Sequence, residues 1–139
     1  MWAGLGYYRR GRLLLQGAQL VQSSPDYSGV IPSDREKLRS IPGIGEYTSA
    51  AIASIGFGKP VAAMDANLVR VLTRIKGIHS NTESHRANEE GEALITCCEE
   101  AKLRPGCLNQ ALMELGARVC QAKCVKNCLS IAKYTFYSH

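Results

Sequence analysis

A Pro-Gly-Ile-Gly turn at residues 42–45 constrains the fold most, because it separates two short stretches with helical spacing. The residues Ser33-Asp34-Arg35-Glu36 form a capping box, in which Ser33 caps the first helix and Glu36 reaches back to the Ser33 N–H. A second helix is expected at about residues 46–55, and small residues permit close packing of one face: Ser49, Ala50 and Ala53. Since proline and glycine end helices, the sequence predicts two helices joined by a tight turn over about residues 34–56.

The rest of the chain also follows the helical period. Apolar residues stand at i, i+3, i+4 and i+7 in one stretch, as in an amphipathic helix: Leu68, Val71, Leu72 and Ile75. We expect further helices at about residues 7–22, 67–76, 84–101 and 108–119. No stretch alternates as a strand does, so the predicted fold class is all-α. The length of 139 residues suits one domain, or a large piece of one, with a buried core.

Composition narrows the class of partner. Lysine and arginine outnumber aspartate and glutamate by 17 to 12, and the net charge of +5 favours a polyanionic partner. No apolar run approaches the ~20 residues that span a bilayer. The first residues lack the layout of a signal peptide, so we expect a soluble protein with no membrane partner. Six cysteines without a secretory signal indicate reduced thiols or metal ligands rather than disulfides.

The glycines of the turn suggest a phosphate site. Gly43 and Gly45 can adopt backbone angles closed to other residues, and they leave no side chain to block a phosphate. The N–H groups of both glycines and of the following first turn would then point at an anion. We expect DNA contacts from Gly43, Ile44, Gly45 and Tyr47, which would position DNA without reading its sequence. The alternative is an ordinary tight turn with glycine caps.

Asp65 stands between an apolar run and an amphipathic helix. At such a place the commonest role of an aspartate is to cap the helix. Asn67 could serve as the cap equally well, which would leave Asp65 free to face a groove. An ionised carboxylate there could stabilise an oxocarbenium-like sugar as a base departs, or bond to it transiently. On the residues alone both roles remain open.

Three separated motifs carry a family resemblance. LxxIPGIGxYTxxAIxSxxFG followed by MDANLVRVL resembles the helix-hairpin-helix DNA glycosylases, and WAGLGYYRRGR is similar to the adenine DNA glycosylases of the MutY type, particularly those of animals. NQALMELGARVC is similar to the same family's approach to an iron–sulfur cluster. The resemblance implies a helical barrel domain beside a cluster domain. It also implies base-excision repair, in which the N-glycosidic bond of adenine mispaired with 8-oxoguanine or guanine is hydrolysed in double-stranded DNA. A monomer in the nucleus, with the mitochondrion as a second intracellular location, is expected.

The resemblance assigns roles to several residues. Asp65 corresponds to the catalytic aspartate, and Asn67 to the asparagine that helps to place it and contacts DNA. Tyr47 stands where related glycosylase-lyases carry a lysine; without an amine no Schiff base forms, so a monofunctional glycosylase is expected. Tyr7 corresponds to a tyrosine wedged beside 8-oxoguanine, the alternative being a core aromatic. Ala66 replaces a glycine of the family, and it would be strained if that position needs a positive φ.

Two features depart from the family pattern. The chain contains no counterpart of the Glu-Val-Met-Leu-Gln-Gln-Thr-like stretch, whose glutamate acts as general acid, and it lacks the C-terminal domain that recognises 8-oxoguanine. Loss of a general acid commonly costs ~10²–10⁴-fold in rate. We therefore expect an internal piece of a longer protein, spliced or truncated. The alternative function is a catalytically impaired fragment that still binds DNA.

The cysteines also depart from the family pattern. The resemblance implies a 4Fe–4S cluster on C-x6-C-x2-C-x5-C, but here the candidate ligands are Cys120, Cys124 and Cys128, with Cys107 as a possible fourth donor. This spacing favours zinc or no metal over the cluster. We expect residues 1–119 to form the glycosylase core and residues 120–139 a degenerate cysteine-containing tail. Other residues that carry no expected metal role are the buried thiols Cys97 and Cys98 and the surface or loop residues His79, His85 and His139.

Overall fold

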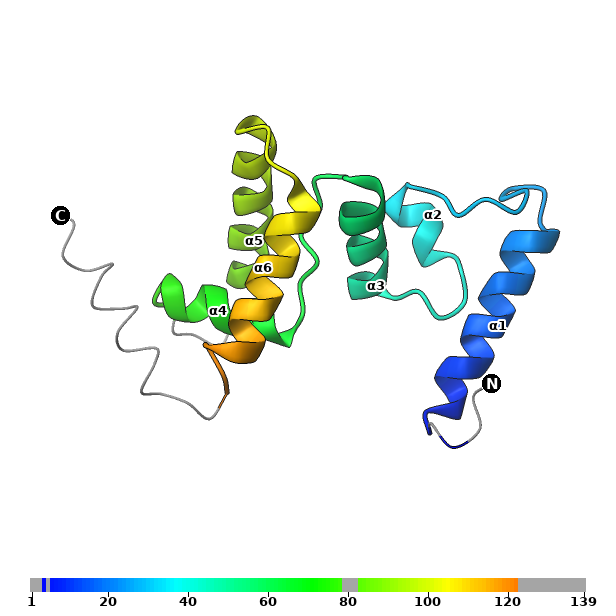
Figure 1. Ribbon diagram of the computed structural model, residues 1–139, viewed down its shortest axis with the longest axis horizontal. Helices are drawn as coiled ribbons and strands as arrows, with labels where there is room; N and C mark the ends of the chain where they lie inside the picture. Colours follow the sequence, from blue (N-terminus) through cyan, green and yellow to red (C-terminus); the bar gives the residue numbers. More distant parts are fainter. Residues whose placement is uncertain (1–3, 5, 79–82, 123–139) are drawn as a thin grey trace.

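The computed structural model describes residue 4 and residues 6–78 and 83–122, and all regular structure in that range is helical (Figure 1). The helices, in chain order, are α1 (Tyr8–Ser23), α2 (Arg35–Arg39), α3 (Glu46–Ala51), the π-helix η1 (Ile52–Gly56), α4 (Ala66–Ile75), α5 (Glu83–Glu100) and α6 (Pro105–Arg118). The predicted all-α class is confirmed. Within the described residues no helix is long and apolar enough to cross a bilayer.

The helices form two groups. In Figure 1, α1, α2 and α3 lie on one side of the molecule, and α4, α5 and α6 lie on the other. The two groups meet where α6 packs against η1. The core of the first group is centred on Leu38, Ile41 and Ala53, and partly buried apolar side chains pack around it: Val21, Tyr27, Ile44, Ile52 and Val61.

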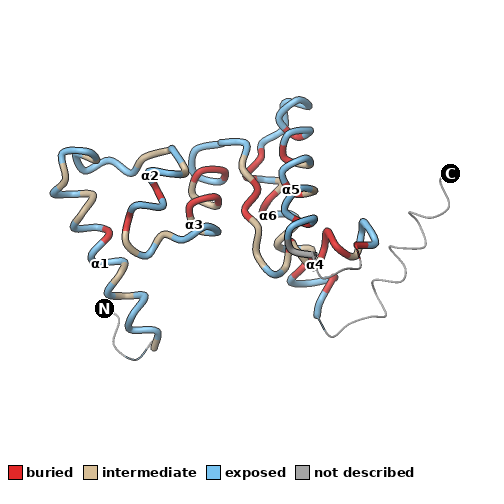
Figure 2. Tube along the Cα trace, turned by 180° about the vertical axis from the view of Figure 1, so that it is seen from behind, coloured by how far each residue is buried: buried red, intermediate tan, exposed pale blue. Residues whose placement is uncertain are grey.

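The second group buries one face of each long helix. On α4 the side chains of Leu68, Val71 and Leu72 are buried, as the apolar period predicts, whereas Ile75 is 40% exposed at the last turn. On α5 the buried residues follow the helical period: Ala87, Gly91, Ile95 and Cys98. Figure 2 shows buried segments, in red, within this group of helices. The periodicity therefore identified the correct faces but extended the buried stripe of α4 by one residue too many.

Helix α1 lies on the hairpin turn. Gly17 is its only buried residue, and a Cβ at that position would lie 2.7 Å from the carbonyl oxygen of Pro42. Gly43 has φ +85°, and a Cβ there would lie 3.1 Å from the Cβ of Leu13. Close approach of the two backbones therefore depends on a glycine on each side.

The N-terminus of α2 differs from the predicted capping box. Asp34, not Ser33, is the N-cap, and its Oδ1 accepts a hydrogen bond of 2.9 Å from the Lys37 N–H. The helix consequently begins one residue later, and Glu36 lies in its first turn. There Glu36 pairs with Arg39 at 3.5 Å instead of reaching back to the Ser33 N–H. Aspartate and serine are about equally good N-cap residues, so Ser33 and Asp34 were both possible caps. In the structure the later residue, Asp34, caps the helix.

Two other helix boundaries differ from the prediction. The helix expected at residues 46–55 is α-helical only to Ala51 and continues as the π-helix η1, although its small face is buried as predicted. Helix α6 begins at Pro105 rather than near residue 108, with proline at the first helical position, where its missing N–H costs nothing.

Candidate functional site

The hairpin turn presents unpaired N–H groups. Gly43 has the positive φ expected of it, but Gly45 does not: its φ of −91° and ψ of −171° are ordinary extended angles. Within the described residues the N–H groups of Gly43 and Gly45 have no hydrogen-bond acceptor. Gly45 is also the N-cap of α3 and has no side chain to cap its first turn. A Cβ on Gly45 would meet nothing within 4 Å, so the turn is open on this side.

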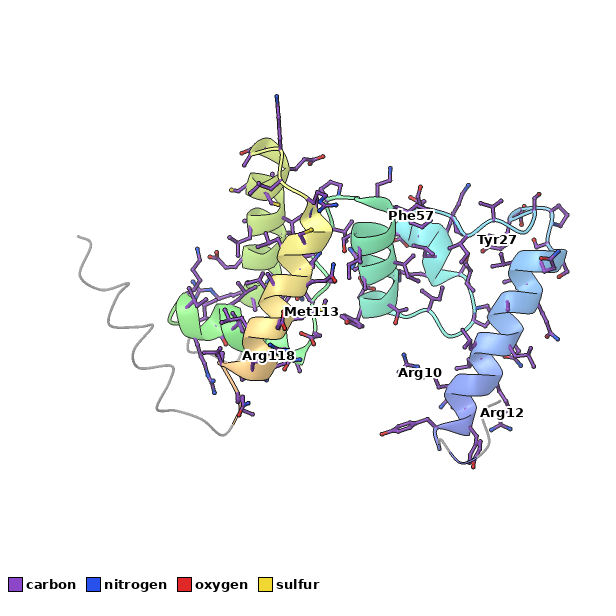
Figure 3. The ribbon with its side chains drawn as sticks, in the orientation of Figure 1. Arg10, Arg12, Tyr27, Phe57, Met113 and Arg118 are labelled. Atoms are coloured by element: carbon purple, nitrogen blue, oxygen red, sulfur yellow. The ribbon has the colours of Figure 1, made fainter. Side chains whose placement is uncertain are left out.

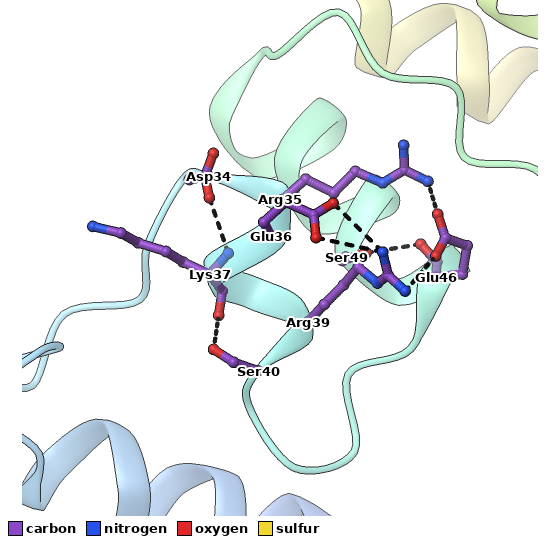
Figure 4. A network of polar contacts seen from close by, with 8 residues as sticks. All are labelled: Asp34, Arg35, Glu36, Lys37, Arg39, Ser40, Glu46 and Ser49. Atoms are coloured by element: carbon purple, nitrogen blue, oxygen red, sulfur yellow. Dashed lines mark hydrogen bonds and ion pairs between the residues drawn. The ribbon is translucent and has the colours of Figure 1, made fainter.

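The charge of Glu46, in the first turn of α3, would repel an anion at the turn. Two guanidinium groups from α2 offset it: Arg35 forms an ion pair with Glu46, and Arg39 forms a second at 3.2 Å (Figure 4). The Glu46 side chain remains 61% exposed, so each pair is worth little to stability. Their effect is local: the carboxylate next to the turn is held on the side of α2.

A group of arginines lies at the N-terminal end of α1. Arg9, Arg10 and Arg12 are exposed, the first turn of α1 contains no acidic residue, and none of the three forms an ion pair with a described residue. Figure 3 shows Arg10 and Arg12 at this end of α1, on the opposite side of the molecule from Arg118. Sequence reasoning counted these charges only in the total. Their spacing within about one helical turn was the signal that could have identified them.

Tyr7 precedes these arginines as the N-cap of α1, with φ 49°. Its side chain is 85% exposed, so it is not a core aromatic. The role of core aromatic is therefore wrong for the described residues, and the wedge stays a prediction. Tyr47 of α3 is 42% exposed, and its hydroxyl donates to the sulfur of Met113 in α6 at 3.7 Å. Its phenol therefore lies between the hairpin and α6.

Asp65 is the N-cap of α4. Its Oδ1 accepts a hydrogen bond from the Leu68 N–H at 2.7 Å, and its Oδ2 accepts one from the Asn67 side-chain amide at 2.9 Å. The expectation that Asn67 could replace Asp65 as the cap is wrong, because Asn67 lies inside the first turn and donates to Asp65 instead. The two donors hold the half-buried carboxylate in one orientation. Ala66 is the first helical residue and has no positive φ, so the strain considered for it does not arise.

A polar network extends from Asp65 to Cys120. The Asn67 side chain, which donates to Asp65, accepts from Arg70 Nη2 at 2.7 Å. Arg70 also donates to the carbonyl oxygens of Gly116 and Cys120, at 2.8 and 2.7 Å. Sequence reasoning missed Arg70, although its place three residues after Asn67 on a helix was a usable signal. The network joins the start of α4 to the end of α6.

The described residues do not supply a metal site. Cys120 is buried, and Arg74 Nη1 lies 3.3 Å from its sulfur. Cys124 and Cys128 lie outside the described residues, and the residues that are described contain no group of three His, Cys, Asp or Glu that could hold a metal. A 4Fe–4S cluster needs four ligands, so the donors in this range do not fit it.

Other predicted roles of cysteine and histidine can be compared with their burial. Cys98 is buried, but Cys97 is exposed, which corrects the prediction that both are buried. Adjacent residues on a helix point about 100° apart, so only one of them faces the core. Cys107 is exposed on α6. His85 is exposed as expected, whereas His79 and His139 lie outside the described residues.

Comparison with known proteins finds several curated relatives, all named as adenine DNA glycosylases. The chain is 43% identical over 120 residues to an adenine DNA glycosylase of Arabidopsis thaliana, which covers 86% of this chain and 18% of that protein. It is 43% identical over 121 residues to that of Homo sapiens and 40% identical over 124 to that of Schizosaccharomyces pombe, covering 22% and 26% of those proteins. No protein-family model matches the chain.

The fold and these similarities define the class as a helix-hairpin-helix DNA glycosylase. Within it, the chain belongs to the adenine DNA glycosylases of the MutY type. It spans roughly a quarter or less of the length of these three relatives.

Proposed function

We propose that the protein is a monofunctional adenine DNA glycosylase, which hydrolyses the N-glycosidic bond of adenine mispaired with 8-oxoguanine or guanine. The observation that carries this proposal is the setting of Asp65, whose two carboxylate oxygens are each held by one donor. The relatives named as adenine DNA glycosylases support the choice of adenine as the leaving base. The substrate is double-stranded DNA, bound by one copy of the chain in the nucleus or the mitochondrion.

The chemistry proposed for Asp65 is electrostatic. When the bond between the sugar carbon C1′ and adenine N9 breaks, its electron pair leaves with the base and the sugar becomes oxocarbenium-like. A carboxylate oxygen accepts up to two hydrogen bonds, so each oxygen of Asp65 retains capacity to face that cation or a water. Water then supplies a hydroxyl to C1′ and a proton to adenine. Tyr47 offers no amine, so strand cleavage through a Schiff base does not follow.

The hairpin and the start of α1 are proposed to bind the DNA backbone. The free N–H groups of Gly43 and Gly45 suit a phosphate oxygen, and Ile44 between them and Asn67 beside Asp65 are proposed as further DNA contacts. Arg9, Arg10 and Arg12 add positive charge, and the exposed Tyr7 next to them is available to enter the base stack. Such an insertion offsets part of the few kcal/mol needed to flip a base.

A second candidate function is DNA binding without excision. The observation that favours it is the cap itself, since an aspartate that only starts α4 would look the same. In that case the hairpin and the arginines would still bind DNA.

A single-turnover excision assay on a duplex with one adenine opposite 8-oxoguanine separates the two functions, with Asp65→Asn as the variant. Asparagine is an equally good N-cap, so the fold is kept while the charge is lost. We expect abasic product from the parent and a rate at least ~10²-fold lower from the variant, with similar DNA affinity. Tight binding without product from the parent would instead support the second function.

A further inference from the structure

One face of α6 contacts both helix groups. Its residues recur at helical spacing along that face: Gly106, Asn109, Met113 and Gly116. A Cβ on Gly106 would lie 2.6 Å from the carbonyl oxygen of Ser54 in η1, and a Cβ on Gly116 would lie 2.8 Å from the Cβ of Asn67 in α4. The same face therefore touches the hairpin at one end and the helix of Asp65 at the other.

Asn109 is the buried polar residue of this face, with 0% exposure. Its Oδ1 accepts from the Ala63 N–H at 3.0 Å. Its Nδ2 donates to the Val61 carbonyl oxygen at 2.9 Å and to Ser54 Oγ at 3.0 Å. Ser54 is itself only 1% exposed. One amide thus joins η1, the end of the hairpin, to the segment that precedes Asp65.

The segment from residue 59 to residue 64 depends on such bonds, because it belongs to no helix. Its Ala62 and Ala63 are nevertheless buried, so their backbone groups need partners. Two other bonds tie the segment to its neighbours: the Lys59 N–H donates to the Ala53 carbonyl oxygen in η1 at 2.9 Å, and the Ala62 N–H donates to the Glu92 carboxylate at a long 3.4 Å. Ala63 is two residues from Asp65, so a shift of the Ala63 backbone also moves the Asp65 carboxylate.

We infer that Asn109 is a positioning residue for Asp65: it holds residues 61–63 against η1 and so sets the distance between the DNA-binding hairpin and the catalytic carboxylate. The inference rests on the proposed function. A carboxylate displaced by about 1 Å from its productive place costs on the order of 10²-fold in rate. Binding of DNA through the hairpin and α1 does not use Asn109.

The first test substitutes Asn109→Leu, which keeps a similar volume but leaves the buried Ala63 N–H and Val61 carbonyl unpaired. Gln110→Leu is the matched control, because Gln110 is exposed and bonds only within α6. We expect Asn109→Leu to lower the single-turnover excision rate ~10²-fold with its Kd for the mispaired duplex within about threefold of the parent. The control should match the parent. Equal losses of rate and affinity, or an unchanged rate in a folded variant, would overturn the inference.

Ser54→Ala is the milder variant, should Asn109→Leu not fold, because it removes one of the three bonds. The second measurement is amide hydrogen exchange, which needs no activity. We expect faster exchange at Ala63 and Leu68 in either variant, with Leu38 in the hairpin core unchanged. Unaltered exchange at both amides contradicts the inference. A parent that excises no adenine contradicts the proposed function only, since the exchange data still decide the positioning role.

Discussion

At the scale of single residues, the structural role of Asp65 as a cap is compatible with the chemical role proposed for it. Capping occupies one lone pair of Oδ1 with the Leu68 N–H, and the amide of Asn67 occupies one of Oδ2. Neither bond removes the negative charge, and both restrict rotation of the carboxylate. A cap is therefore compatible with electrostatic catalysis, because a preorganised charge does not have to reorient as the sugar cation develops.

The two glycines of the turn have different requirements, which makes them a matched pair. Gly43→Ala should destabilise the protein by about 1–2 kcal/mol, because φ is positive there and the new Cβ would press on Leu13. Gly45→Ala should leave stability nearly unchanged, since its φ is ordinary and the space is open. Urea unfolding of both variants measures the difference.

We expect DNA affinity, unlike stability, to be sensitive to the substitution at Gly45. A methyl group on Gly45 would stand where the phosphate approaches, so we expect Gly45→Ala to weaken binding roughly tenfold, or about 1.4 kcal/mol. Full affinity in this variant would mean that the phosphate does not approach Gly45. Equal stability of the two alanine variants would contradict the role of the positive φ at Gly43.

At the scale of elements, local signals predicted where helices occur but not how they end. Periodicity located α1, α4 and α5 to within about two residues, because an amphipathic helix needs only its own face to be recognised. The apolar periodicity of residues 46–56 did not indicate the change from the α-helix α3 to the π-helix η1. Ser54 Oγ bonds to Asn109, 55 residues away, and Gly106 of α6 packs on the Ser54 carbonyl. A contact of that range cannot be read from the residues of the helix itself.

The junction of α4 with the end of α6 provides a prediction at this scale. Arg70 donates to the carbonyl oxygens of two buried residues, Gly116 and Cys120. Arg70→Met would remove both of these bonds, and we expect a loss of about 2 kcal/mol or more in the free energy of unfolding. Arg70→Lys should recover only part of it, because an ammonium cannot reproduce the guanidinium geometry.

Chemical denaturation followed by circular dichroism measures these losses. Arg118→Met on α6 is the control: Arg118 is exposed, and its ion-pair partner among the described residues is Glu114, at 3.1 Å. Its change should stay within ±0.5 kcal/mol, as for most surface substitutions. A fully stable Arg70→Met protein would show that the network contributes nothing to the packing of α4 on α6.

At the scale of the whole molecule, charge and apolar surface are unevenly distributed. The arginines of α1 lie beside exposed apolar residues, among them Leu14 and Leu15 at 60% and 61% exposure. At the hairpin, positive and negative charges offset one another, because Glu46 forms ion pairs with Arg35 and Arg39. Long-range attraction of DNA should therefore come chiefly from α1, and the hairpin should contribute directed N–H groups.

The salt dependence of DNA binding tests this division. The slope of log K against log salt is about −0.9 for each phosphate neutralised on duplex DNA. We expect Arg10→Gln and Arg12→Gln each to reduce the slope by about 1, with a similar loss for mispaired and fully paired duplexes. Arg118→Gln, on the opposite side of the molecule, should leave the slope unchanged. An unaltered slope in the α1 variants would exclude this helix from the DNA interface.

The sequence by itself determined the all-α class, the place of the hairpin and the chemistry available at Asp65, because helical periodicity, turn residues and side-chain type are local properties. The tertiary structure alone decided that Asp65 rather than Asn67 caps α4, that Tyr7 is exposed, and that Arg70 reaches Cys120. It also decided that Asn109 holds Ala63, 46 residues earlier in the chain. Each of these depends on which partner lies within hydrogen-bonding distance once the helices have packed, and packing brings together residues that no local pattern relates.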